Sequence, residues 1–141
     1  MRLAPVLLAG ALTLAGCGKS DTSTDAPATG EASVETVAVA PTAAMGEQVF
    51  RRCIACHTID KGGSNGIGPN LHGVVGRAVA SHPGFSYSGA MKAKGGVWDE
   101  AALDAYLKAP MKDVPGTRMA FAGVIDAADR KALFLYLEQQ K

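Results

Sequence analysis

The segment Cys53-Ile54-Ala55-Cys56-His57 constrains this chain of 141 residues more than any other feature. Two thiols three positions apart can each bond to one of the two vinyl groups on a haem edge, and a histidine that follows directly is then placed under the iron. The pattern predicts one covalently attached haem c. Cys53 and Cys56 would carry the two covalent links, and His57 would be the proximal ligand of the iron.

A Cys-x-x-Cys pair has two other common uses, a redox-active dithiol and half of a zinc site. A zinc site needs four nitrogen or sulfur ligands, and Cys17 is the only other cysteine in the sequence. A thioredoxin-like dithiol is typical of a strand-helix-strand segment, which the surrounding residues do not indicate. Neither use explains a histidine directly after the second cysteine, so haem attachment is favoured.

The beginning of the chain is typical of an export signal. Arg2 precedes an apolar run of 12 residues, which is too short to span a membrane as a mature helix. The segment Leu14-Ala15-Gly16-Cys17 resembles the lipobox of bacterial lipoproteins, in which the cysteine is lipidated and becomes the new first residue. We therefore expect removal of residues 1–16 as a lipoprotein-type signal peptide. Lipidated Cys17 would then anchor the protein at the periplasmic face of the bacterial inner membrane; the alternatives are a soluble periplasmic protein and an uncleaved anchor helix.

Residues 17–43 are predicted to form a lipidated N-terminus followed by a disordered tether. From residue 18 onward this segment consists mostly of Thr, Ser, Ala, Pro, Asp and Glu, and it contains no aromatic residue. Such a segment cannot bury enough apolar surface to fold. A tether of this kind would raise the effective concentration of the next domain at membrane partners.

Residues 44–141 are predicted to form one domain, and its fold class is all-α. A first helix is expected from about residue 44 to 55, with Gly46 and Phe50 on one face. A short second helix is expected over residues 87–94, where two glycines follow. A buried haem would enlarge the modest core that a domain of this size can build.

Two further helices follow in the sequence. The third has Asp99 as its predicted N-cap and ends before Pro110, and the last begins after the N-cap Asp126. The stretches 61–84 and 110–123 are rich in Gly and Pro and show no strand alternation, so we expect long loops that wrap a haem. The residues of the last helix expected to face inward are Leu133, Phe134 and Leu137.

The residues after the haem motif are similar to those of a known family. Gly68-Pro69-Asn70-Leu71-His72-Gly73 is followed in order by Arg77, Tyr87 and Trp98. Nearly all of the domain resembles a class I cytochrome c of the mitochondrial and alpha-proteobacterial type. The resemblance implies the cytochrome c fold, in which about four helices and long loops surround one haem. It also implies that the Pro69 carbonyl accepts a hydrogen bond from the proximal histidine, and that Arg77, Tyr87 and Trp98 bond the haem propionates.

The segment Pro115-Gly116-Thr117-Arg118-Met119 resembles the loop that supplies the sixth iron ligand in this family. The resemblance implies that Met119 binds the iron through sulfur and that Thr117 is part of the haem environment. Tyr106 resembles the tyrosine whose hydroxyl approaches that sulfur. Met91 is a departure, because the family usually has an asparagine there that is linked to a buried water. The residues that resemble the family's contact between the terminal helices are Gly46, Phe50, Leu133 and Tyr136.

An iron with histidine and methionine on its two axial positions changes oxidation state readily and has no open site for a substrate. The resemblance therefore implies a monomeric one-electron carrier and not an enzyme. Its expected partners are a quinol-oxidising cytochrome reductase complex and a terminal oxidase or another periplasmic acceptor. The alternatives are a haem enzyme or gas sensor, which would need an open or easily displaced sixth ligand, and a subunit whose haem is structural.

The charge of the domain gives little support to strong electrostatic steering. Residues 44–141 contain 12 Lys and Arg against 9 Asp and Glu, a formal balance of +3. Steering by acidic partner surfaces should therefore be modest. Nothing in the sequence indicates binding to nucleic acid.

Overall fold

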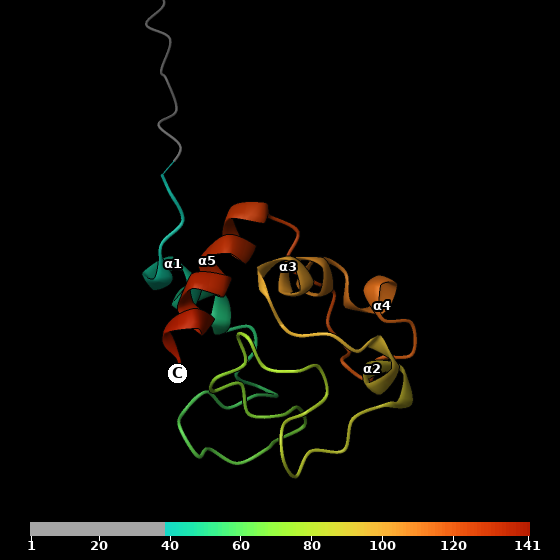
Figure 1. The fold of residues 1–141 in the computed structure, drawn as a ribbon. Coiled ribbons are helices and arrows are strands. Elements are labelled where there is room, and N and C mark those ends of the chain that lie inside the picture. The colour runs from blue at the N-terminus through green and yellow to red at the C-terminus, as the bar shows by residue number, and fades with distance from the viewer. Residues whose placement is uncertain (1–38) are drawn as a thin grey trace, which may run out of the picture. The chain divides into compact units, whose positions relative to one another are not determined.

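A computed structural model describes residues 39–141, so the predicted leader, Cys17 and most of the predicted tether lie outside the described residues. Five α-helices follow one another in this part of the chain, with long loops between the first and the second (Figure 1). The prediction of an all-α fold class is confirmed for these residues, with five helices where about four were expected. None of the helices in this range is long and apolar enough to cross a membrane.

Helix α1 (Ala43–Phe50) begins at the N-cap Thr42, whose hydroxyl accepts a hydrogen bond from the Met45 amide at 3.3 Å. The expectation that this helix continues to residue 55 is wrong. The amide of Cys53 bonds the Phe50 carbonyl three residues back at 2.7 Å, so the chain tightens into successive turns over residues 51–56. These turns carry the haem motif.

Helix α2 (Gly89–Lys94) is two residues shorter at its start than expected, because the Ser88 side chain caps it by accepting from the Met91 amide at 3.1 Å. Helix α3 (Glu100–Lys108) begins after the predicted N-cap Asp99, whose carboxylate accepts from the Ala102 amide at 2.8 Å.

Helix α4 (Pro110–Asp113) lies in a stretch expected to be loop, and that expectation is wrong for these four residues. Proline ends α3 but is well suited to the first position of a new helix, where its missing N–H has no partner to lose. Helix α5 (Ala127–Gln139) begins after the predicted N-cap Asp126, which accepts from the Asp129 amide at 2.9 Å.

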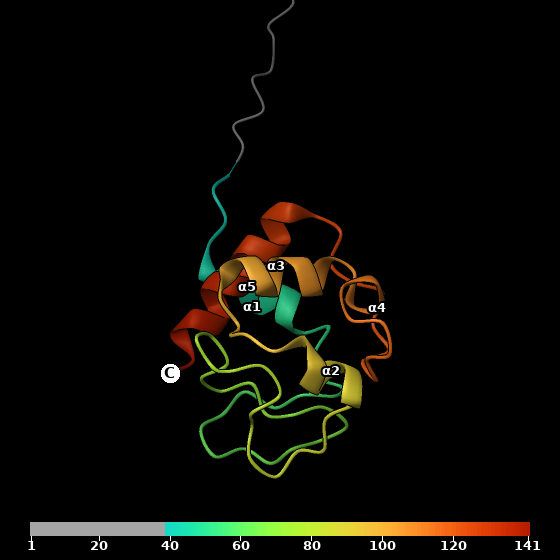
Figure 2. The same ribbon diagram turned by 45° about the vertical axis from the view of Figure 1, so that its right-hand side comes forward.

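The terminal helices α1 and α5 form the most extensive helix pair of the fold and lie side by side in both ribbon views (Figures 1 and 2). Gly46 faces the Ala132 carbonyl, and a Cβ on Gly46 would overlap that oxygen. Phe50 packs on Tyr136 with ring centroids 5.3 Å apart. Leu133 is 1% exposed. The predicted contact between the terminal helices is therefore confirmed in detail.

The core connects the helices with the loops. Helix α3 packs on both α5 and α4, while the loop between α1 and α2 lies beneath the helices in the view of Figure 1. Met91, the departure from the family pattern, is buried in this core. Phe134 is only half-buried, although its neighbours on α5 are buried as expected. The buried cluster consists of Val49, Phe50, Val74, Met91, Trp98, Leu103, Tyr106, Val114, Val124, Leu133 and Leu137.

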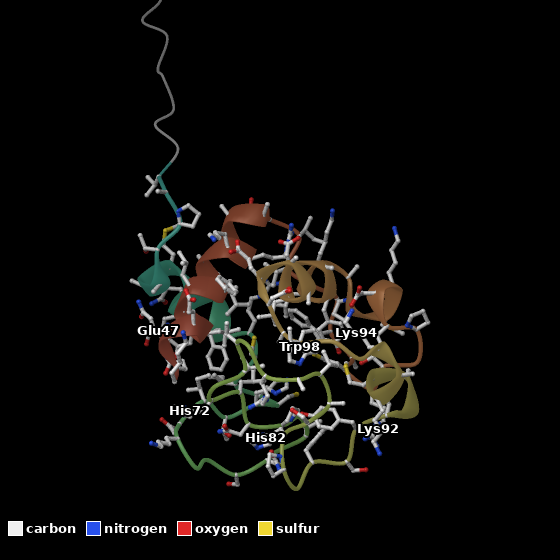
Figure 3. The ribbon with its side chains drawn as sticks, viewed as in Figure 1. Glu47, His72, His82, Lys92, Lys94 and Trp98 are labelled. Atoms are coloured by element: carbon white, nitrogen blue, oxygen red, sulfur yellow. The ribbon has the colours of Figure 1, made fainter. Side chains whose placement is uncertain are left out.

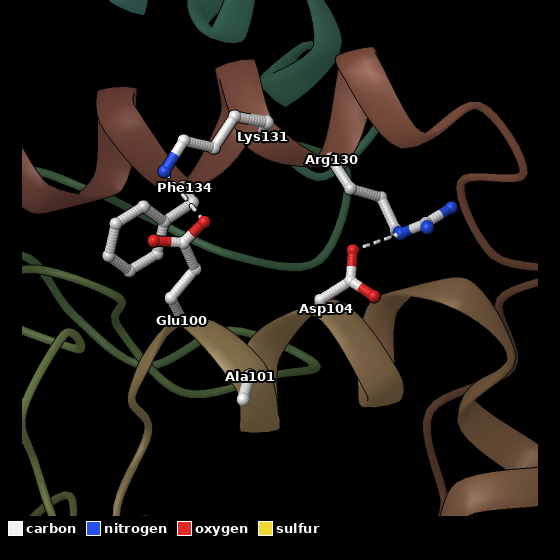
Figure 4. A pocket seen from close by; sticks show the side chains of 6 residues that line it. All are labelled: Glu100, Ala101, Asp104, Arg130, Lys131 and Phe134. Atoms are coloured by element: carbon white, nitrogen blue, oxygen red, sulfur yellow. Dashed lines mark hydrogen bonds and ion pairs between the residues drawn. The ribbon is translucent and has the colours of Figure 1, made fainter.

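Two ion pairs cross a shallow groove between α3 and α5 (Figure 4). Arg130 is buried and bonds the Asp104 carboxylate at 2.6 Å, and it also donates to the carbonyls of Val124 and Ile125. Lys131 pairs with Glu100 at the same distance, but both of these side chains are exposed. The two pairs have similar lengths and very different surroundings.

Arg130→Ala is expected to lower the free energy of unfolding by about 2 kcal/mol, because two carbonyls lose their donor together with the ion pair. Lys131→Ala is expected to cost about 0.5 kcal/mol or less, because an exposed pair is screened by water and salt. Thermal denaturation of the haem-loaded protein measures both changes. Equal losses of unfolding free energy in the two variants would contradict the larger stabilising role of Arg130.

Candidate haem site

The turns after α1 bring the two cysteines of the motif together. The amides of Cys56 and His57 both bond the Cys53 carbonyl at 3.0 Å, which closes a compact turn around the motif. Both cysteines are half-buried thiols. Burial raises the pKa of the Cys53 thiol, and the positive charge of Arg52 partly offsets this effect. The two thiols therefore lie on one short turn, as two links to one haem edge require.

The imidazole of His57 is fixed by the loop that follows. Its Nδ1 lies 2.7 Å from the Pro69 carbonyl, so Nδ1 carries the proton and donates, and Nε2 keeps its lone pair for a metal. Burial lowers the pKa of His57, and the hydrogen bond to Pro69 partly opposes this. Gly68 packs directly against the ring, where a Cβ would lie 2.6 Å from Nδ1. The ring is thus neutral, oriented and closely held.

Asn70 organises this loop and was not among the residues predicted for the site. It is 2% exposed, and its amide nitrogen donates to the Thr58 hydroxyl at 2.6 Å and to the Asp60 carbonyl at 3.0 Å. Its side-chain oxygen accepts from the His72 amide at 2.9 Å. A polar residue directly after Pro69, in a loop without secondary structure, was the available signal for this role.

Arg77 is half-buried and lies in the long loop between α1 and α2. It donates to the carbonyls of His72 at 3.0 Å and Asn70 at 3.2 Å, and it contacts Nδ1 of His82 at 3.2 Å. His72 and His82 both lie in the loop region (Figure 3). Partial burial and the charge of Arg77 lower the pKa of His82, so His82 is a neutral acceptor.

One donor of Arg77 is unsatisfied. Its Nε is buried and has no hydrogen-bond partner among the described residues. Burial lowers the pKa of this guanidinium, and the neighbouring Tyr87 raises it. A buried N–H on a cation is costly unless it meets an acceptor, and a carboxylate is the acceptor that suits a guanidinium best. The site therefore offers Arg77 to an anionic group that lies within the fold.

Tyr87 and Trp98 both lie near Arg77. Tyr87 is half-buried and packs edge-to-face on Phe85 at 4.9 Å. Trp98 is buried, and its backbone amide bonds the Arg77 carbonyl at 2.9 Å. The Trp98 ring packs on Tyr106 at 5.2 Å, which connects this side of the site with the Met119 side.

The loop that carries Met119 is held from inside by Tyr106. The hydroxyls of Tyr106 and Thr117 lie 2.9 Å apart, and the Met119 amide donates to the Thr117 hydroxyl at 3.3 Å. Burial raises the pKa of Tyr106, the Thr117 bond lowers it, and the carboxylate of Asp113 raises it. Met119 is half-buried and packs against the core. The loop therefore places the Met119 side chain against the core.

These residues fit a haem. The fold supplies two thiols on one turn, a neutral imidazole with an available Nε2, and a thioether on a fixed loop. The orphaned Nε of Arg77 suits a propionate carboxylate, which is the anionic group of a haem. Gly68 lies so close to the His57 ring that a side chain at this position would overlap it.

Comparison with known proteins gives the same result. Residues 43–141 match the family described as Cytochrome c. The chain is 48% identical to cytochrome c2 of Rhodoblastus acidophilus over 96 residues, which cover 68% of this chain and 90% of that protein. It is 47% identical to cytochrome c-type cyt cy of Rhodobacter capsulatus over 105 residues, 74% of this chain and 52% of the relative.

A solved structure supports the fold as well. Cytochrome cH from Methylobacterium extorquens superposes with a TM-score of 0.65 at 41% sequence identity, over 70% of this chain and 98% of that one. The chain therefore belongs to the cytochrome c family of alpha-proteobacterial type, and it is a monohaem electron carrier with one covalent haem c and its iron, not an enzyme.

Proposed function

We propose that this protein is a membrane-tethered periplasmic carrier whose haem iron is bound by His57 and Met119. The observation that carries the proposed ligation is that two potential iron ligands are held in place. The His57 imidazole is oriented by the Pro69 carbonyl, and Met119 lies on a loop that is held by Tyr106. The bound haem iron gains and loses one electron at a time. With His57 and Met119 both bound to it, the iron would have no open site for a substrate.

Further residues would hold the haem through its covalent links and through its propionates. Cys53 and Cys56 would hold the haem through two thioether links, and the turn that carries them keeps both thiols on one edge. Arg77, Tyr87 and Trp98 would bond the propionates, with the buried Nε of Arg77 as the principal donor. Neutralising a buried carboxylate in this way avoids the cost of an unpaired buried charge.

The Met119→Ala variant tests the iron ligands. The ferric wild type is expected to show the weak charge-transfer band of iron-sulfur ligation, and the variant is expected to lose it, because no other group replaces the thioether. The variant should also bind external imidazole at least about a hundredfold more tightly, since its sixth position no longer has a protein ligand to displace. Optical titration measures both effects. A wild type without the band, or one that binds imidazole as readily as the variant, would favour a haem enzyme or gas sensor.

The tether is the second part of the proposal. Lipidation at Cys17 would hold the protein on the periplasmic face of the inner membrane, and several acyl chains on one residue give stable anchoring. If the segment of about 26 residues that follows is the tether its composition predicts, its root-mean-square span would be roughly 28 Å. A monomeric domain on such a tether could take an electron from a quinol-oxidising reductase complex and deliver it to a terminal oxidase or another periplasmic acceptor.

Cys17→Ala is expected to move the haem-loaded protein from the membrane to the soluble fraction, because the acylated residue is lost. Mass spectrometry of the membrane-extracted wild type should show removal of residues 1–16, acyl groups on Cys17 and the added mass of one haem. A mass that retains residues 1–16 would show an uncleaved anchor. A soluble wild type with an unmodified N-terminus would show a soluble periplasmic carrier.

A further inference from the structure

Lys94 and Asp113 form an ion pair between two helices that do not pack on each other. The Lys94 Nζ lies 2.7 Å from the Asp113 carboxylate, and the two side chains are 19% and 21% exposed. Lys94 ends α2 and Asp113 ends α4, and no direct packing joins these helices. Lys94 also lies over the ring of Trp98, 5.9 Å from its centroid (Figure 3). Side chains therefore connect the two helices where backbone packing does not.

The pair stands at the start of the loop that carries Met119. Asp113 is the last residue of α4, and the Val114 and Thr117 amides that follow bond carbonyls of residues 110 and 114, each at 2.9 Å. The loop touches the α2 region at two further points. A Cβ on Gly116 would lie 3.2 Å from the Ala90 Cβ, and the Arg118 guanidinium donates to the Ser86 carbonyl.

Two attachments on different sides thus determine where the loop lies. Tyr106 holds Thr117 from the interior, and the contacts with α2 hold the loop from the outside. Of the outer contacts, the Lys94–Asp113 bond is the one made between two opposite charges, and it is largely shielded from solvent. A partly buried charged pair with good geometry is worth more than an exposed one.

We infer that Lys94 and Asp113 are positioning residues that clamp the Met119 loop against α2 and so control how often the loop opens. The inference rests on the proposed ligation by Met119. If the loop must open before another ligand reaches the iron, the apparent affinity for that ligand scales with the open fraction. Weakening the clamp raises this fraction without changing the donors themselves.

Asp113→Asn is the sharpest variant, because it removes the charge, keeps the shape of the side chain and leaves the Lys94 contact with Trp98 in place. In the ferric haem-loaded protein it is expected to raise the affinity for imidazole about fivefold. Glu100→Gln is the matched control: it breaks the 2.6 Å ion pair between Glu100 and Lys131, which joins α3 to α5 and involves neither α2 nor α4. The control should bind imidazole like the wild type.

Lys94→Gln and the double variant complete a thermodynamic cycle. Each single variant should give about the same gain in imidazole affinity, and the double variant should give no more than either one. The clamp would be overturned if the two single variants had additive effects on imidazole affinity. It would also be overturned if Asp113→Asn raised this affinity no more than Glu100→Gln does.

Amide hydrogen exchange separates this inference from the ligation on which it rests. In Asp113→Asn the amides of Val114 and Thr117 should exchange about fivefold faster, while the Gly73 amide, bonded to the Gln140 carbonyl, should not change. If the wild type lacks the charge-transfer band, the proposed ligation by Met119 fails. The exchange rates of the loop amides still test whether the Lys94–Asp113 pair holds the loop. Unchanged exchange at Val114 and Thr117 would overturn the clamp.

Discussion

Gly68→Ala is expected to abolish correct ligation by His57 in most of the protein. The added Cβ would lie 2.6 Å from Nδ1 and 2.8 Å from Nε2, closer than real carbon contacts allow. The ring would have to move, and this would break its 2.7 Å hydrogen bond to the Pro69 carbonyl. Overpacking together with a lost buried bond costs about 3 kcal/mol or more, a shift of more than about a hundredfold away from the native ring position.

The measurement is the yield of haem-loaded protein and the spin state of its ferric spectrum. We expect a lower yield and a high-spin spectrum in what is loaded, because the iron loses a strong nitrogen ligand. Gly73→Ala is the control: its φ of 63° strains any side chain, but nothing lies within 4 Å of the added Cβ. It should cost about 1 kcal/mol and leave the spectrum unchanged. A normal spectrum in Gly68→Ala would contradict the ring position described above.

Gly46→Ala is expected to lower the free energy of unfolding by about 3 kcal/mol, although alanine is the better helix former. The new Cβ would overlap the Ala132 carbonyl and lie 2.8 Å from the Tyr136 Cβ. Both neighbours belong to α5, and one of them is backbone that cannot rotate away. The terminal helices must therefore separate, and the pair between Phe50 and Tyr136 loosens with them.

Thermal denaturation of the haem-loaded protein checks this, with a fall in Tm of about 12 °C or more. Gly89→Ala is the matched control because it also adds a methyl group to a helix, yet nothing lies within 4 Å of the new atom. It should be neutral or stabilising by about 0.5 kcal/mol. Similar losses in both variants would mean that helix contact at Gly46 is not the cause.

Local features of this protein could be predicted from the sequence. Asp99 and Asp126 were correctly predicted as N-caps, because a cap bonds an amide only three residues away. The end of α3 before Pro110 has the same local origin. The helix length after residue 50 was wrong, because the tight turns of the haem motif compete with the helix over the same residues.

The identity of the cofactor could also be predicted from the sequence, since the five-residue motif places two thiols and an imidazole on one turn. The bond from His57 to Pro69 was expected only from resemblance to a family, and so were the positions of Arg77, Trp98 and Tyr106 around the site. The bond is present at 2.7 Å. No spacing rule could have predicted it, because it joins loop residues whose backbone has no repeating geometry.

The haem motif, the N-caps of α3 and α5 and the all-α class could be predicted from the sequence alone, because each depends on residues within a few positions of one another. The hydrogen bonds of the buried Asn70 side chain, the ion pair of the buried Arg130 and the ion pair between Lys94 and Asp113 depend on the tertiary structure. The bonds Asn70–Asp60, Lys94–Asp113 and Arg130–Asp104 join residues 10, 19 and 26 positions apart. Their partners are chosen by the way the chain packs, and a pattern along the sequence does not record which distant side chains meet.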